Sequence, residues 1–185
     1  MAKQDCTQRL GGTVQIDDVY LGGERAGGNL GFYENKVPFV AAVSLKKHGH
    51  PIYLRLNLAR GVTRDLLSKW AQVSLDAAAR VISDGRGCLA AVVDADCPHQ
   101  PIVVGALKSR DLPQFKWVNM VQGNMKTTLA GAFHSANYRK YAKRYRSAFA
   151  NRFNRRFDLR GLVAHLIFDL VRGKPAKKSG NQSAC

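Results

Sequence analysis

Two carboxylates stand inside segments that otherwise predict buried β-strands. Asp17 lies in the run VQIDDVYL at 14–21, and Asp84 follows the short run RVIS at 80–83. A buried carboxylate is costly unless it is paired or binds a metal. Two hard oxygen ligands on adjacent strands would make a site suited to Mg²⁺. The alternative interpretation is that Asp84 initiates a turn and Asp17 lies on an exposed strand face.

Three further residues bear on this candidate metal site. Asp17 and Asp18 are neighbours in a predicted strand and therefore point to opposite faces, so we expect only one of them to share a face with Asp84. Whether Asp18 assists metal binding stays open. Asn119 and Lys126 are seven residues apart in a predicted helix, which places them on one helix face. An Asn carbonyl can ligate Mg²⁺, and Lys126 would project the same way, towards a phosphate.

The remaining elements predict a mixed α/β fold with helices on both faces of a central sheet. The strands that we expect are 14–21, 37–45, 52–58, 80–83 and 99–107, of which the second and third form a hairpin. Helices are expected at 63–77, 88–93, 118–133, 136–153 and 159–171. The first helix would bury Leu66, Leu67, Trp70 and Val73. Residues 1–173 are expected to form a single domain, and 174–185 a disordered tail.

The charge of the chain is strongly basic and unevenly distributed. There are 29 Lys and Arg against 13 Asp and Glu, a net charge of +16 in 185 residues. Residues 112–185 carry 15 of the basic side chains and 2 of the acidic ones, a net charge of +13. Such a segment repels itself unless an anion is present, so the balance points to a polyanion such as nucleic acid. The alternative is a solvated basic face.

Much of this positive charge lies in a segment with a helical stripe of aromatic residues. The stripe, best explained by core packing, comprises Tyr138, Tyr141, Tyr145, Phe149, Phe153 and Phe157. The basic side chains between them suit a surface that contacts the phosphate backbone without reading sequence. The predicted DNA-contacting residues are Arg139, Lys140, Lys143, Arg144, Arg146, Arg152, Arg155 and Arg156 in this segment, with Lys126 and His134 before it. His99 has a structural or a DNA-contacting role.

Several classes of protein are disfavoured. The Gly-rich stretch 22–31 is expected to be a loop, and it lacks the Gly-Lys-Ser/Thr ending of a phosphate-binding P-loop. The four cysteines form no CxxC pair, so neither a zinc ribbon nor a disulfide framework is indicated. No apolar run is long enough to span a membrane, and no signal peptide is recognisable. We therefore expect a cytoplasmic protein.

Taken together, these motifs resemble the catalytic domain of bacterial insertion-sequence transposases, in the DDE superfamily with a ribonuclease-H-like fold. The resemblance covers about residues 9–160 and is carried by IDDVYLGGE, ENKVPFVAAVS, VISDG, WVNMVQGNMKTTLAGAFH and NRFNRRFDL. Asp17, Asp84 and Asn119 stand where the superfamily has Asp, Asp and Glu, and Lys126 matches the basic residue that often follows. The resemblance implies a group with Asn as its third residue.

The resemblance implies a Mg²⁺-dependent enzyme, with Mn²⁺ as a possible substitute, that cleaves element ends and joins them to target DNA. Asp17, Asp84 and Asn119 would hold the metal, and Lys126 would be the fourth catalytic residue. The partners it implies are double-stranded DNA at the bacterial nucleoid and, by analogy, a second copy of the chain. Longer members carry an N-terminal zinc-binding region, which this chain is expected to lack or to obtain from a separate partner. The alternatives are a truncated, non-catalytic DNA-binding relic and a ribonuclease-H-like nuclease without strand transfer.

Overall fold

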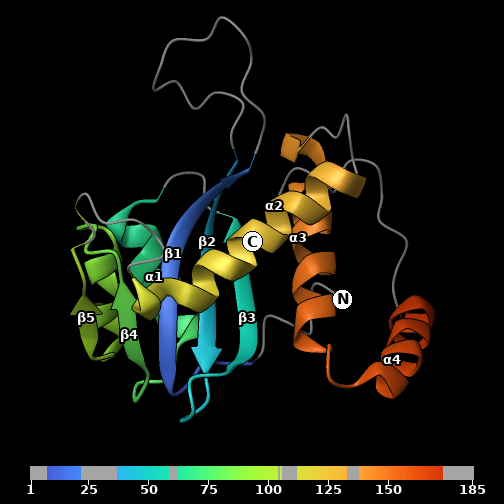
Figure 1. The fold of residues 1–185 in the computed structure, drawn as a ribbon, viewed down its shortest axis with the longest axis horizontal. Coiled ribbons are helices and arrows are strands. Elements are labelled where there is room, and N and C mark those ends of the chain that lie inside the picture. The colour runs from blue at the N-terminus through green and yellow to red at the C-terminus, as the bar shows by residue number, and fades with distance from the viewer. Residues whose placement is uncertain are drawn as a thin grey trace, which may run out of the picture.

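A five-stranded mixed sheet forms the centre of the molecule in a computed structural model of the chain (Figure 1). The structure describes residues 8–21, 37–58, 62–103, 105, 112–132 and 138–172. The strand order is β3-β2-β1-β4-β5, with β1 spanning Thr13–Leu21, β2 Val37–Leu45, β3 Pro51–Leu58, β4 Arg80–Ser83 and β5 His99–Pro101. This order, with helices on both faces, is that of a ribonuclease-H-like fold, so the expected fold class is confirmed.

The pairing directions explain how the candidate site is assembled. Strands β1, β2 and β3 pair antiparallel, and the predicted hairpin turns at residues 46–50. Strands β4 and β5 instead run parallel to β1, and a helical connection precedes each of them. Strand β1 is therefore paired along its full length with β2 but only at its start with β4, where Gln15 is opposite Ile82 in the last pair.

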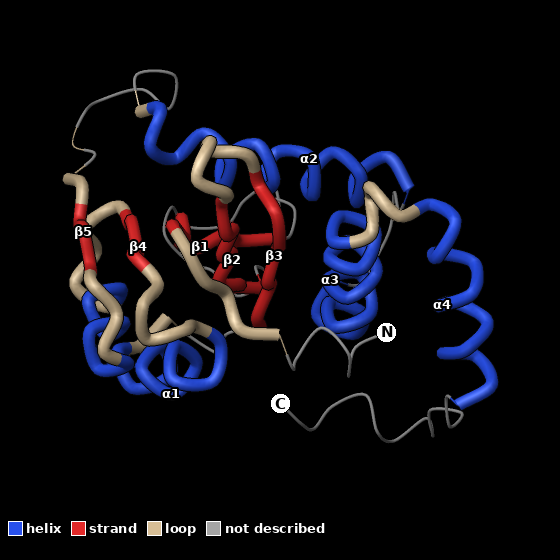
Figure 2. Tube along the Cα trace, turned by 90° about the horizontal axis from the view of Figure 1, so that it is seen from below, coloured by secondary structure: helices blue, strands red, loops and turns tan. Residues whose placement is uncertain are grey.

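Alternation along β1 divides the core between the two faces of the sheet. Val14 and Ile16 pack with α1 (Arg64–Ser74) and with the 3-10 helix η1 (Leu89–Ala95) on one face. Val19 and Leu21 pack on the other face with α2 (Lys116–Ala132) and α3 (Tyr138–Asn154). Figure 2 shows α1 and α2 on opposite sides of the strands. Because both faces are covered, polar side chains on β1 must find partners within the protein.

One such partner contact fixes the start of α2, which follows the short 3-10 helix η3 (Pro113–Phe115). The Gln15 side chain is 3% exposed, and its Oε1 accepts hydrogen bonds from the backbone N–H groups of Trp117 and Val118 over 3.1 and 3.0 Å. The first N–H groups of a helix have no partner within the helix. Gln15 satisfies two of them and thereby attaches the first turn of α2 to β1.

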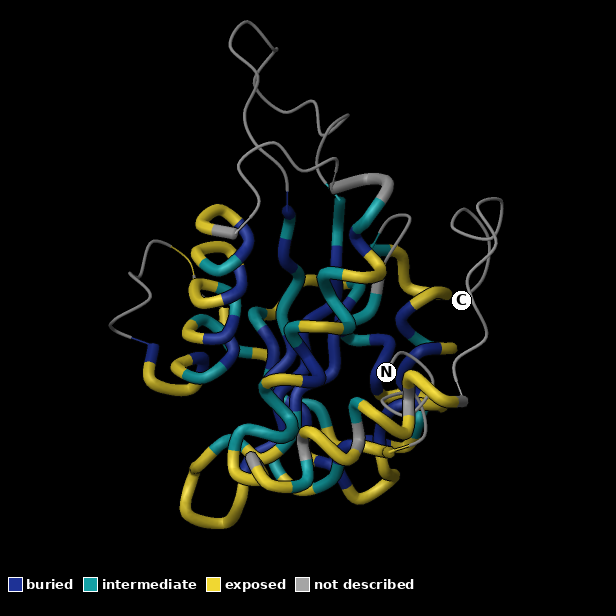
Figure 3. Tube along the Cα trace, turned by 90° about the vertical axis from the view of Figure 1, so that its right-hand side faces the viewer, coloured by how far each residue is buried: buried dark blue, intermediate teal, exposed yellow. Residues whose placement is uncertain are grey.

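Helix α3 covers the outer edge of the sheet. The Asn154 side chain at the end of α3 donates to the backbone oxygen of Leu54 over 3.0 Å and accepts from its N–H over 2.7 Å. These bonds satisfy backbone groups of the edge strand β3 that would otherwise be open to another chain. Figure 3 shows the buried positions concentrated at the centre of the molecule. Helix α4 (Leu159–Arg172) lies away from the sheet and exposes Val163, Ile167 and Leu170.

Three sequence-based expectations are corrected. Helix α1 ends at Ser74 and turns Leu67, Trp70, Ala71 and Ser74 inward, so Leu66 and Val73 are exposed instead of buried. Small Ala71 and Ser74 allow close packing against the sheet, which a hydrophobicity pattern does not weigh. Strand β5 has three residues rather than nine, because its partner β4 ends at Ser83. Phe157 is 86% exposed, since α3 ends at Asn154, before the aromatic stripe is complete.

No helix among the described residues is both long enough and apolar enough to cross a membrane. The expected loop at 22–31 and the expected tail at 174–185 lie outside the described residues.

Candidate active site

The carboxylates of Asp17 and Asp84 lie together where β1 and β4 separate. The parallel register ends with Gln15 opposite Ile82, so Asp84 follows the last residue of β4 at the level of Asp17. One carboxylate oxygen from each of Asp17, Asp18 and Asp84 lies within 4.8 Å of the other two. Ligands of open α/β sheets are bound at such positions, where strands diverge at their carboxyl ends. Sequence reasoning had suggested that Asp17 and Asp84 meet, and the structure brings them together.

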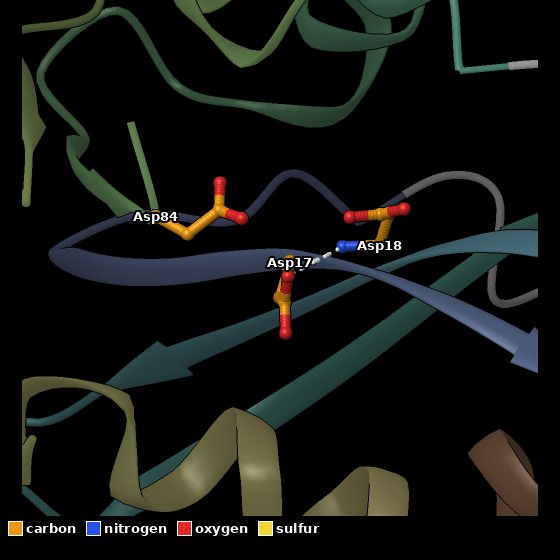
Figure 4. A group of neighbouring side chains, drawn as sticks. All are labelled: Asp17, Asp18 and Asp84. Carbon is orange, nitrogen blue, oxygen red and sulfur yellow. Dashed lines mark hydrogen bonds between the residues drawn. The ribbon is translucent and has the colours of Figure 1, made fainter. Parts of the chain in front are cut away.

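Asp18 joins the cluster, although its side chain lies on the opposite face of β1 from that of Asp17. Figure 4 shows Asp18 and Asp84 on one side of the strand and Asp17 on the other. As expected, only one of the two neighbours shares a face with Asp84: it is Asp18, while Asp17 reaches the cluster from the other face of β1. Beyond Gln15, β1 has no β4 residue beside it, so Asp84 sits at the open edge of the strand and is reached from both of its faces.

The acidic cluster contains a cation from the protein itself. Arg86 Nη1 lies 2.7 Å from Asp18 Oδ2, and Arg86 Nε lies 3.4 Å from Asp84 Oδ2. Burial lowers the pKa of Arg86, but the two carboxylates outweigh it and the net shift is upward. The pKa of the Tyr20 hydroxyl is also raised, because burial disfavours its charged form and the charge of Asp18 adds to the shift.

The charged form of Asp17 is disfavoured by its surroundings. The pKa of Asp17 is raised from 3.8 to about 6, chiefly by burial, and the charges of Asp18 and Asp84 contribute to this shift. Two hydrogen bonds act in the opposite direction: Gln122 Nε2 and the backbone N–H of Asp18 each donate to Asp17 over 2.8 Å. A carboxylate whose charge is this unfavourable is a frequent feature of functional sites, because a bound cation relieves it.

Helix α2 directs polar side chains towards this edge of the sheet. Val118, Val121 and Met125 form its buried face. At about 100° per residue, Asn119 and Lys126 lie about 20° apart around the helix, and Gln122 lies within about 60° of both. Because Gln122 contacts Asp17, the flank that carries all three side chains faces the acidic cluster. Asn119 is half-buried and Lys126 is exposed on that flank.

His99 takes a structural position beside the site. One of its ring nitrogens, Nε2, lies 2.8 Å from the hydroxyl oxygen of Ser83, which is fully buried and directly precedes Asp84. Burial lowers the pKa of His99, which favours the neutral ring. This contact joins the end of β4 to the start of β5, and it favours a structural role for His99 over contact with DNA.

The acidic cluster fits a hard divalent cation. Carboxylate oxygens are the donors that Mg²⁺ and Mn²⁺ prefer, and Mg²⁺ is commonly held by one or two carboxylates plus substrate phosphates. Asp17 and Asp84 supply such oxygens, and the side chain of Asp84 is 21% exposed, which leaves it accessible to a ligand.

Comparison with known protein families agrees with this geometry. Residues 9–154 match the ISXO2-like transposase domain. The chain belongs to this transposase family. The match contains all five strands of the described part of the chain, α1, α2 and α3, as well as both aspartates of the site. No curated protein and no solved structure matches the chain significantly.

The basic surface of the transposase domain is only partly formed by the predicted residues. Lys143, Arg144 and Arg152 are exposed on α3, while Arg146 and Arg155 are half-buried. Arg156 turns inward: its guanidinium donates to the backbone oxygens of Pro51 and Phe153 and lies 4.0 Å from the Phe153 ring. The side chains of Arg139 and Lys140 lie outside the described part of the structure, as does His134.

Sequence reasoning missed three residues of the site: Gln15, Arg86 and Gln122. Each lies close in sequence to a residue that the sequence analysis did identify. Gln15 is two residues before Asp17 on the same strand face, Arg86 is two residues after Asp84, and Gln122 lies between Asn119 and Lys126 on the helix flank. Helical and strand periodicity identifies such neighbours, but polar side chains on an otherwise buried face are ambiguous until their partners are known.

Proposed function

We propose that this transposase domain cleaves and joins DNA by metal-dependent phosphoryl transfer at Asp17 and Asp84. The observation that supports this most directly is the meeting of the two carboxylates at the divergence of β1 and β4, within 4.8 Å in a chain of a transposase family. Two divalent ions, Mg²⁺ or Mn²⁺, would be held there: one would activate the attacking oxygen and the other would stabilise the leaving 3′-oxygen.

The protein side chains would divide the remaining work. Asp17 and Asp84 hold the charge that attracts the cation, and Asn119 adds a neutral amide oxygen from α2. Gln122 orients the Asp17 carboxylate through its 2.8 Å hydrogen bond. Lys126, exposed on the same flank of α2, is positioned to contact a phosphate of the DNA end.

DNA is the partner that the family implies, and α3 offers a surface for it. Its exposed basic side chains suit contacts to phosphates, which provide affinity and register rather than sequence specificity. Joining requires two element ends to be held together, so the proposal extends to two copies of the chain on paired ends. Equilibrium sedimentation with and without an end duplex measures this stoichiometry.

The activity is tested on a duplex that carries the element's end, with and without Mg²⁺. Wild-type protein should nick the duplex and join the resulting 3′-hydroxyl end to a second duplex. Asp17→Asn and Asp84→Asn should each abolish both steps while duplex binding is retained. Nicking without joining would favour a nuclease, and binding with neither step would favour a non-catalytic DNA-binding protein.

A further inference from the structure

The guanidinium of Arg86 lies between two carboxylates of the acidic cluster. It contacts Asp18 at 2.7 Å through Nη1 and Asp84 at 3.4 Å through Nε. The chain reverses after Asp84 at Gly85, whose φ of +79° is rarely adopted by other residues. The Arg86 backbone N–H then donates to Asp84 Oδ1 over 3.1 Å. This turn returns Arg86 towards the site that Asp84 belongs to.

The two carboxylates hold Arg86 with unequal strength. The Asp18 side chain is 3% exposed, and its contact with Arg86 is a short charge-assisted hydrogen bond. The Tyr20 hydroxyl is within hydrogen-bonding reach of both members of this pair. The Asp84 side chain is 21% exposed, and its contact with Arg86 is longer. A buried carboxylate depends on its partner, because removing the partner leaves an uncompensated charge.

The faces of β1 separate the roles of its two aspartates. Asp17 points to the face of α2, where Gln122 contacts it. Asp18 points to the other face, where Arg86 covers its Oδ2. A cation bound by Asp17 and Asp84 would lie beside the Asp18–Arg86 pair and would compete with Arg86 Nε for Asp84 Oδ2.

We propose that Asp18 anchors Arg86 and is not a metal ligand, and that Arg86 is a positioning residue and counter-ion that competes with the divalent cation for Asp84. This inference rests on the proposed metal site at Asp17 and Asp84. Its consequence is that the DNA-free protein binds the cation more weakly than its carboxylates alone would. Removing the positive charge of Arg86, which lies next to this partly exposed metal site, should lower the dissociation constant for the cation by about tenfold.

Mn²⁺ binding to the DNA-free protein tests the inference, with free Mn²⁺ measured by electron paramagnetic resonance. Arg86→Gln should tighten Mn²⁺ binding by about tenfold. Asp18→Asn should weaken it, because Arg86 then pairs with Asp84 alone. The decisive protein is the double variant Asp18→Asn/Arg86→Gln, which removes both members of the ion pair together and should bind Mn²⁺ at least as tightly as wild type.

A matched control removes an arginine of equal charge elsewhere. Arg64 forms a 3.0 Å ion pair with Asp94 between α1 and η1, so Arg64→Gln also breaks one ion pair. It should leave Mn²⁺ binding unchanged. Thermal unfolding of the same proteins without metal adds a second readout: Asp18→Asn and Arg86→Gln should each destabilise the protein, and the double variant should recover much of the loss.

Two results would overturn the inference while the metal site stands. If the double variant binds Mn²⁺ as weakly as Asp18→Asn alone, Asp18 is itself a ligand. If neither Arg86→Gln nor the double variant binds more tightly than Asp18→Asn, Arg86 does not compete. The metal site fails separately: Asp17→Asn and Asp84→Asn should each abolish Mn²⁺ binding, and unchanged binding in both would remove the proposed function and this inference with it.

Discussion

Gln122 and Asp17 are 105 residues apart in the chain, yet the Gln122 amide nitrogen donates a 2.8 Å hydrogen bond to the Asp17 carboxylate. The bond joins the middle of α2 to the middle of β1. A second link, from Gln15 to the first turn of α2, lies two residues earlier on the same face of the strand. Together the two links fix how far along β1 the helix lies, and therefore where Asn119 and Lys126 stand relative to the aspartates.

The raised pKa of Asp17 predicts that stability depends on pH. The unfolded chain releases the Asp17 proton near 3.8, whereas the folded protein keeps it until about pH 6. The folded state binds more protons between these values, so its stability falls as pH rises from about 4 to 6 and stays lowered above that. Asp17→Asn should therefore stabilise the metal-free protein at about pH 7.5 by on the order of 2 kcal/mol, and give no gain at about pH 3.5.

Chemical denaturation at the two pH values measures this difference. Asp65→Asn, which neutralises an exposed carboxylate in the first turn of α1, serves as the control and should give no gain at either pH. An equal stabilisation by Asp17→Asn at both pH values would show that the effect comes from packing rather than from the charge.

Gln122→Leu should shift the pH dependence of metal-dependent nicking upward. The hydrogen bond from Gln122 lowers the pKa of Asp17, so its loss leaves the carboxyl group protonated to a higher pH. Nicking at about pH 6.5 should fall more than nicking at about pH 8.5, where Asp17 is ionised in both proteins. Asn124→Leu, on the exposed side of the same helix, should leave the profile unchanged. A uniform loss across the pH range would instead indicate a displaced helix.

Asn119 is expected to act as a neutral ligand, so its replacements should differ. Asn119→Ala should nearly eliminate nicking, because the amide oxygen is lost. Asn119→Glu should keep some activity and lower the Mg²⁺ concentration needed, since a third carboxylate binds the cation more strongly. A Mg²⁺ titration of nicking measures both. Normal nicking by Asn119→Ala across the titration would exclude Asn119 as a ligand and turn attention to Gln122.

The basic side chains of α3 should carry salt-dependent binding. Replacing Lys143, Arg144 and Arg146 together with Ala should weaken binding to any duplex, and the slope of log K against log salt should fall by about 0.9 per lost phosphate contact. Arg156→Ala should instead lower the free energy of unfolding, because Arg156 bonds to the backbone of β3. An unchanged salt slope in the folded triple variant would leave these residues a role in solubility alone.

Gln15→Leu should destabilise the protein by about 1–3 kcal/mol, because the first N–H groups of α2 lose their buried acceptor. Gln15→Glu keeps an acceptor oxygen and provides the matched comparison. Urea denaturation gives the free energies of unfolding. Full stability of Gln15→Leu would show that packing at position 15, rather than the hydrogen bonds, holds α2 in place.

The sequence by itself determined the architecture of this transposase domain. Alternation in 14–21 and 37–45, the hairpin between 45 and 51, and the helical period of 118–133 are local patterns, and local backbone preferences act within such stretches. The same patterns placed Asp17, Asp84 and Asn119 on elements that a single sheet and its covering helix bring together. The family motifs around these residues pointed to the same conclusion.

Only the tertiary structure decided how the polar residues pair within the site. The order β3-β2-β1-β4-β5 ends the pairing of β1 with β4 at Gln15, and this opening lets Asp84 be approached by Asp18 on its own face of the strand and by Asp17 from the opposite face. The contact of Arg86 with Asp18 spans 68 residues, and that of Gln122 with Asp17 spans 105. A periodic pattern records which face a side chain occupies, but partners so distant in sequence are selected by the geometry of packing, where a buried charge must be compensated.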